Sequence, residues 1–182
     1  MGTMSVNEFI DTVILDELDK MINAHHFYYL GFILVSTSIE FTGALLDQED
    51  FSKPNLAEER FIKALKLFPT KYSPFTIKNN QHYLYKHLRC GMVHMLRPNH
   101  GVVFTHKAEA INGPGHLALS TDNQLILIIE ELFSDLCNVI NKIRNGNLRT
   151  HLQKNLGAPF LSVSNKAYDA STLSEPTSGC FK

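Results

Sequence analysis

The amino-acid sequence predicts a mainly α-helical bundle with one small β-hairpin before the last long helix. Apolar residues recur at three- and four-residue steps through most of residues 7–97 and again in residues 130–143, which is the period of one buried helix face. Between residues 101 and 120 the pattern changes to short β-like runs around a turn. The chain has 182 residues, of which 44% are hydrophobic and 19% charged, as expected for one globular domain.

We therefore expect one helical domain at residues 1–156, with the hairpin at about residues 101–120, and a polar tail at residues 157–182. The tail is rich in Ser, Thr, Asn, Gly and Pro and has no helical period. It is either loosely ordered or docked on the surface.

The first 47 residues carry helical patterns throughout. One amphipathic stripe consists of Phe9, Ile10, Val13, Ile14, Leu18, Met21 and Ile22. Residues 27–35 are apolar on nearly all sides, which indicates a central, buried helix. Residues 23–26 are either a break between two helices or part of one long helix, since no proline forces a break there.

Three further helices are expected. The first covers residues 56–68, and the second lies within residues 76–97 and is closed by Pro98. The predicted buried face of this second helix is Leu84, Leu88, Met92, Met95 and Leu96. The last helix covers residues 130–143 and stops at Gly146.

The hairpin is predicted from two short runs, residues 101–106 and 116–120, that flank the turn signal Asn112-Gly-Pro-Gly115. Residues 125–128 are apolar and too short for periodicity to decide their structure. They either add a third strand or begin the last helix.

Charge is divided unevenly along the chain although the net charge is only -1. Residues 1–59 hold eleven acidic and two basic residues, whereas residues 60–107 hold nine Lys or Arg and no Asp or Glu. Such a basic segment is typical of proteins with an anionic partner. The alternative is that the acidic first third packs against the basic middle, so that the charges neutralise internally.

Three features of the sequence predict a soluble, cytoplasmic protein with no membrane partner. Three widely spaced cysteines without a Cys-x-x-Cys pair fit reduced thiols. Acidic residues occupy the region where a signal peptide would be basic and then apolar. The longest apolar run, residues 27–35, is about half of what a membrane span needs.

The chemistry of the chain centres on Arg89 and His94, which form an Arg-x4-His pair. A histidine can move a proton of a ribose 2′-hydroxyl, and a guanidinium can hold a phosphate and stabilise its transition state. On an ideal helix the two side chains point about 140° apart, so a shared site needs the arginine to reach round or the helix to bend at Gly91. The alternative is structural: Arg89 pairs with the acidic first helices, with Glu40 as one candidate partner, and His94 is an interior histidine.

The stretch Leu84-Tyr-Lys-His-Leu-Arg-Cys-Gly-Met-Val-His94 resembles the Arg-x4–6-His motif of the HEPN superfamily. The turn-rich segment that follows and the last helix also resemble uncharacterised bacterial HEPN-like proteins with an Arg-Cys-Gly-x-x-His core. The resemblance implies a helical bundle that dimerises and brings two copies of the motif together. It also implies that active members cleave RNA without a metal, with Arg89 and His94 at the catalytic positions.

On this basis we expect a HEPN-like metal-independent endoribonuclease or RNA-binding protein. His94 would act as general acid and base, Arg89 would hold the phosphate, and Lys86, His87 and Arg97 would contribute substrate-binding positive charge. The expected partners are RNA, a second copy of the chain and an unknown antitoxin or effector. The alternative is a non-catalytic dimerisation or protein-interaction module.

No cofactor and no metal are expected. His87 and His94 share a helix face but lie about 10.5 Å apart along an ideal axis, too far to bind one metal ion.

Overall fold

The computed structural model describes residues 2–111, 113, 115–145 and 159–163. Helices predominate, which confirms the predicted mainly α fold. The helical elements are α1 (Val6–Phe9), η1 (Ile10–Glu17), η2 (Lys20–Ala24), α2 (Tyr28–Ala44), α3 (Ala57–Leu65), η3 (Thr70–Thr76), η4 (Tyr85–Cys90), α4 (Gly91–Met95), α5 (Lys107–Ala110) and α6 (Ile129–Arg144). The strands are β1 (Gly2–Ser5), β2 (Val102–Thr105), β3 (Leu125–Ile128) and β4 (Pro159–Val163).

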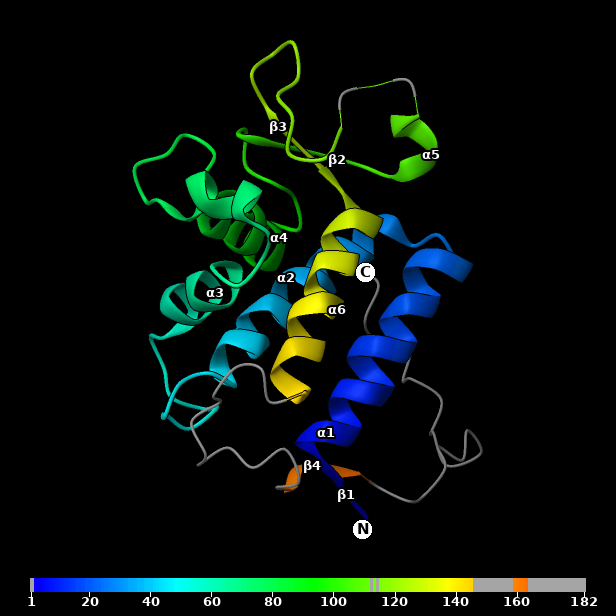
Figure 1. Cartoon of the computed structure of the whole chain (residues 1–182), viewed down its shortest axis with the longest axis vertical. Helices are drawn as coiled ribbons and strands as arrows, with labels where there is room; N and C mark the ends of the chain where they lie inside the picture. Colours follow the sequence, from blue (N-terminus) through cyan, green and yellow to red (C-terminus); the bar gives the residue numbers. More distant parts are fainter. Residues whose placement is uncertain (1, 112, 114, 146–158, 164–182) are drawn as a thin grey trace, which may run out of the picture.

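Helix α2 is the centre of the fold (Figure 1). It contacts α3, α4 and α6, and its side chains Phe32, Val35 and Ile39 are fully buried. Helix α3 approaches α2 closely at Gly43, where an added Cβ would lie only 1.7 Å from the carbonyl oxygen of Arg60. Helices α2 and α3 can pack this closely because position 43 has no side chain.

The N-terminal helical segment, which comprises α1, η1 and η2, lies beside α6 (Figure 1). Its buried column is Ile10, Ile14, Leu18 and Ile22, all members of the predicted stripe. The first helical segment ends at Ala24. His26 has a left-handed φ of 57°, and α2 begins two residues later. A break between two helices is therefore present, at residues 25–27.

The predicted pairing of the hairpin is wrong. Strand β2 pairs in parallel with β3, not with residues 116–120. Residues 117–120 form a short antiparallel turn against the other edge of β3, where the Leu117 N–H donates to the Ile126 carbonyl oxygen (2.8 Å). All four residues of β3 are buried, so this run is a central strand with a partner on each side, and α6 begins directly after it.

Part of the predicted tail docks on the domain. Strand β4 pairs antiparallel with β1, and the Phe160 ring contacts those of Phe9 and Phe41. Residues 146–158 and 164–182, and with them the predicted stop at Gly146, lie outside the described residues. Of the helices that the structure describes, none has the length and apolar composition that crossing a bilayer requires.

Candidate active site at Arg89 and His94

The helix that carries the predicted site lies within residues 76–97, as predicted. It runs through η4 and α4, from Tyr85 to Met95. Leu84, Leu88 and Met92 are fully buried as predicted. Met95 and Leu96 are 60% and 64% exposed, contrary to the prediction, because the helix ends there and Leu96 turns the chain away with a left-handed φ of 52°.

The helix is wound as a π-helix over Tyr85–Cys90 and as an α-helix over Gly91–Met95, so Arg89 lies in the π segment and His94 in the α segment. Nη1 of Arg89 lies 3.4 Å from Nε2 of His94, although a regular α-helix would separate the two side chains by about 140°. The long side chain of Arg89 spans this separation, so the two groups can share one site.

Asn99 holds the π-helical turn from outside. Its backbone N–H donates to the carbonyl oxygen of His87 (3.1 Å), and its side-chain amide donates to that of Lys86 (2.8 Å). The returning loop can come this close because it passes over Gly91, where an added Cβ would lie 2.6 Å from the Arg97 carbonyl oxygen. The loop can therefore approach the helix closely because Gly91 has no side chain.

Arg89 is held in place by an ion pair across the helices. Its Nε donates to Oε2 of Glu40 on α2 at 2.6 Å, and the two side chains are 14% and 23% exposed. Its guanidinium carbon lies 5.9 Å from the centre of the Tyr85 ring. Burial, together with a side-chain hydrogen bond to Cys90, raises the pKa of Tyr85 to about 12, so this hydroxyl stays protonated at neutral pH. The ion pair that the structural alternative expected is thus present.

His94, in contrast, is exposed and not an interior histidine. Arginine can only donate, so in the neutral ring Nε2 of His94 accepts from Arg89 and the proton sits on Nδ1. An unprotonated imidazole nitrogen then lies next to a guanidinium at the surface. This is the arrangement of a general base beside a group that binds phosphate.

The three predicted accessory residues differ in their placement. Lys86 and Arg97 are exposed and have no acidic partner within the described part of the chain. His87 instead packs against Gly101, and its Nδ1 is buried with no hydrogen-bond partner among the described residues. Burial and the neighbouring charge of Lys86 lower the pKa of His87, so its ring is neutral at pH 7 and does not supply the predicted positive charge.

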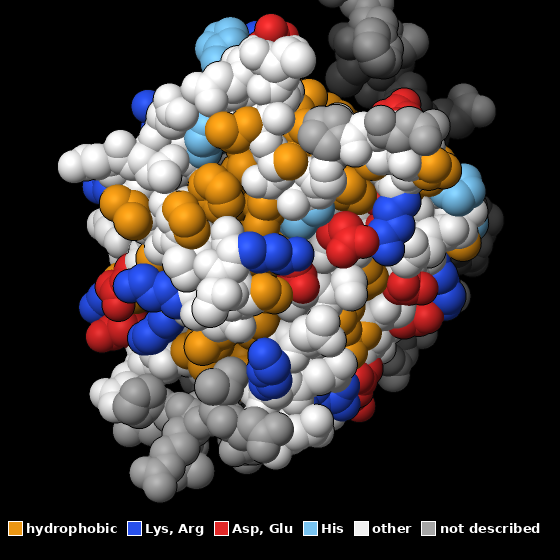
Figure 2. Space-filling model, turned by 45° about the horizontal axis from the view of Figure 1, so that its top comes forward, with side chains coloured by type: hydrophobic (Ala, Val, Ile, Leu, Met, Phe, Trp, Pro, Cys, Tyr) orange, Lys and Arg blue, Asp and Glu red, His pale blue; other side chains and the backbone are white. Residues whose placement is uncertain are grey.

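Much of the basic segment is neutralised internally, as the alternative reading of the charge pattern expected. Arg60, Lys78 and Arg89 pair with Asp47, Glu58 and Glu40 of the acidic first third. Lys71 and Lys107 pair with Asp135 and Glu131 on α6. On the face that Figure 2 shows, basic, acidic and His side chains accordingly lie intermixed between exposed hydrophobic side chains.

Comparison of the chain with family models, curated proteins and solved structures gives no match. The candidate site therefore depends on its geometry and on the resemblance of its motif. Among the described residues, no three His, Cys, Asp or Glu side chains cluster closely enough to hold a metal ion.

A second polar cluster has no counterpart in the sequence prediction. The Ile128 N–H donates to Nδ1 of His116 (2.9 Å), so Nε2 carries the ring proton and donates to the Tyr72 hydroxyl (2.7 Å). Tyr72 donates in turn to Oδ2 of Asp135 (2.9 Å), which Lys71 approaches to 3.3 Å. Burial, then the charge of Lys71, lowers the pKa of His116 to about 4. This network joins η3, the loop before β3 and α6, and it stabilises their packing.

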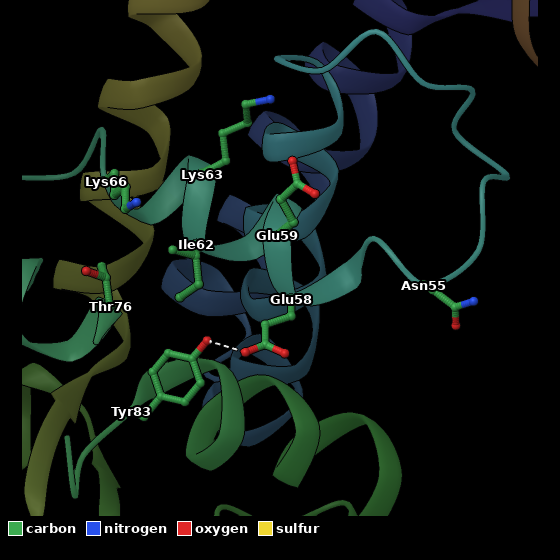
Figure 3. A pocket seen from close by; sticks show the side chains of 8 residues that line it. All are labelled: Asn55, Glu58, Glu59, Ile62, Lys63, Lys66, Thr76 and Tyr83. Atoms are coloured by element: carbon green, nitrogen blue, oxygen red, sulfur yellow. Dashed lines mark hydrogen bonds between the residues drawn. The ribbon is translucent and has the colours of Figure 1, made fainter. Parts of the chain in front are cut away.

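A groove of about 580 Å³ lies elsewhere, between α3 and residues 76–83 (Figure 3). The Tyr83 hydroxyl donates to Oε1 of Glu58 (2.9 Å) at its floor, and Lys78 binds the same carboxylate at 3.0 Å. Lys63 and Lys66 point away from this pair in Figure 3. Because Glu58 is already engaged by Tyr83 and Lys78, this groove shows no chemistry comparable to that of the Arg89–His94 pair.

Proposed function

We propose that this protein is a HEPN-like, metal-independent endoribonuclease in which Arg89 and His94 form the active site. The observation that carries the proposal is the 3.4 Å approach of the Arg89 guanidinium to Nε2 of the exposed His94. It is supported by Glu40, which fixes the arginine, and by the resemblance of the motif.

The proposed reaction uses the ribose 2′-hydroxyl of the RNA as nucleophile. Nε2 of His94 takes the proton of this hydroxyl while the O2′–P bond forms and the P–O5′ bond breaks. The Nη groups of Arg89 hold the non-bridging phosphate oxygens and stabilise the additional charge of the transition state. The leaving O5′ takes a proton from a second acid, for which the His94 of a second copy is available if two motifs meet across a dimer interface.

Lys86 and Arg97 are suited to contact neighbouring phosphates, since both are exposed and lack an acidic partner in the described part of the chain. Contacts of this kind add affinity without sequence preference and weaken with salt. The substrate we propose is RNA in the cytoplasm.

A hydrophobic surface next to the site favours the second part of the proposal, a homodimer. Tyr29, Leu30, Leu34, Met95 and Leu96 are large apolar side chains that are all more than 40% exposed. The Tyr29 hydroxyl donates to the Leu96 carbonyl oxygen, so α2 and the end of α4 contribute to one surface. Clusters of exposed apolar side chains commonly mark protein interfaces. The same surface supports the second candidate function, a non-catalytic interaction module.

The experiment is cleavage of mixed cellular RNA by the purified protein in the presence of EDTA. We expect cleavage by wild type and a loss of at least about 100-fold in His94→Ala, the usual effect of removing a general base. Arg89→Ala should lose activity similarly. The matched control is Arg144→Ala, which removes an arginine from an ion pair of equal length, 2.6 Å to Asp11, outside the site.

Light scattering of each variant reports its oligomeric state, and circular dichroism reports its folding. Full activity in folded His94→Ala would contradict the proposed active site. A folded dimer that cleaves no RNA would favour the interaction module.

A further inference from the structure

A cavity of about 250 Å³ opens beside the Arg89–Glu40 ion pair. Its lining includes the aromatic residues Phe41, Phe51 and Phe160 together with the charged residues Glu40 and Arg89. Arg89 thus borders this cavity and also approaches His94. A ligand with a flat apolar part and an anionic group could contact both at once.

The three aromatic rings are held in fixed positions. The Phe41 and Phe51 rings lie nearly parallel, 5.5 Å apart at an interplanar angle of 11°, and Phe160 meets both edge-on at 5.4 and 5.0 Å. Arg60 anchors the loop that carries Phe51: it donates to the Phe51 carbonyl oxygen (3.0 Å) and is ion-paired with Asp47 (2.7 Å). Rings held in this way offer a preformed surface for a planar group.

The carboxylate of Glu40 can accept a hydrogen bond from a ligand. Glu40 uses Oε2 for Arg89, and among the described residues its other carboxylate oxygen has no partner. Every RNA base has at least one N–H that could donate to such an oxygen. A cavity of this volume is too small for a drug-sized molecule, for which about 300–1,000 Å³ is usual, but it suits a single planar ring system.

We propose that this cavity binds an unpaired nucleobase next to the phosphate that Arg89 holds, and that it thereby selects single-stranded RNA. The inference rests on the proposed function and adds a substrate class to it. Aromatic side chains bind bases by stacking with little sequence preference, which requires the base to leave its own stack. A base inside an RNA duplex cannot enter the cavity, so paired RNA is a poor substrate.

The first test compares three RNAs of one sequence at the cleaved position: single-stranded, fully paired, and single-stranded with an abasic ribose beside the scissile phosphate. We expect the abasic and paired RNAs to be cleaved at least tenfold more slowly than the intact single strand. Equal cleavage of the abasic RNA overturns the inference and leaves the nuclease proposal standing.

The second test removes one ring and does not depend on cleavage. In the His94→Ala background, calorimetry measures the binding of adenosine 3′-monophosphate and of ribose 3-phosphate, which lacks the base. We expect the nucleotide to bind at least tenfold tighter, and Phe51→Leu to abolish this difference. Phe75→Leu is the matched control, because Phe75 is also half-buried but lies outside the cavity.

The outcomes separate the two proposals. Base-dependent binding in a protein that cleaves no RNA supports the cavity and contradicts the nuclease. Equal binding of the two phosphates overturns the cavity whatever the nuclease result. If Phe51→Leu does not fold, the comparison of the two ligands on the His94→Ala protein still decides whether the cavity binds a base.

Discussion

Replacing Gly91 by alanine should disturb the candidate active site without touching any catalytic group. The new Cβ would lie 2.6 Å from the Arg97 carbonyl oxygen and 3.0 Å from the Asn99 backbone nitrogen. Both are backbone atoms, so the loop has to move as a whole. When it moves, the two hydrogen bonds from Asn99 to the carbonyls of His87 and Lys86 lengthen or break.

The expected loss of stability follows from three contributions. Forcing a methyl group into a packed contact costs about 1–3 kcal/mol. The two weakened hydrogen bonds cost about 1 kcal/mol each. Alanine gains about 1 kcal/mol over glycine in a helix, which offsets part of this. The net loss is about 2–4 kcal/mol, which for a chain of this size lowers Tm by roughly 4–16 °C.

Thermal unfolding by circular dichroism measures the shift, and the RNA cleavage assay measures the effect on the site. The matched control is Gly115→Ala, since a Cβ there meets nothing within 4 Å and should change stability by less than about 0.5 kcal/mol. We expect Gly91→Ala to lose cleavage activity at temperatures where it is still folded. If it proves as stable and as active as the control, the loop does not hold the π-helical turn and the reasoning is refuted.

Three further predictions concern the fold. The Cβ of Gly43→Ala would lie 1.7 Å from the Arg60 carbonyl oxygen. This variant should lower the free energy of unfolding, measured in urea, by about 4 kcal/mol or more. A smaller loss would mean that α2 and α3 separate readily. Because the pKa of His116 falls from its ordinary 6.5 to about 4 on folding, the stability that its neutral ring confers is fully present above pH 6.5 and is lost as pH falls to 4, by about 3 kcal/mol. Urea titrations across that range check this, and His116→Asn should remove the dependence. Tyr72→Phe should cost about 1–3 kcal/mol at pH 7 by leaving the His116 donor unpaired, and unchanged stability would contradict the network.

Local patterns predicted the helices well because helical periodicity depends on residues three and four apart. The column Ile10, Ile14, Leu18 and Ile22 and the position of the last helix were identified in this way. Residues 125–128 could not be assigned, since a run of four apolar residues is equally compatible with a buried strand and a helix start. Its parallel partner, β2, is set by the tertiary fold.

The two members of the candidate site could be predicted from the motif, but their geometry could not. An ideal helix separates Arg89 from His94, and the π-helical turn that carries Arg89 is contacted by Asn99, a residue of the following loop. The partner of Arg89, Glu40, lies 49 residues away, and the sequence could name it only as one candidate partner. Tyr72 and His116 are 44 residues apart and carry no shared spacing signal. Contacts of this kind arise from tertiary packing, which no local pattern encodes.

The central claim is that His94 and Arg89 promote attack by a ribose 2′-hydroxyl without a metal ion. The most direct measurement is analysis of the product ends after cleavage in EDTA, with an RNA that carries a single 2′-deoxyribose at the cleaved position as the comparison. We predict 2′,3′-cyclic phosphate and 5′-hydroxyl ends from the all-ribose RNA and no cleavage at the deoxyribose. Products with 3′-hydroxyl and 5′-phosphate ends, or unchanged cleavage at the deoxyribose, would contradict the mechanism.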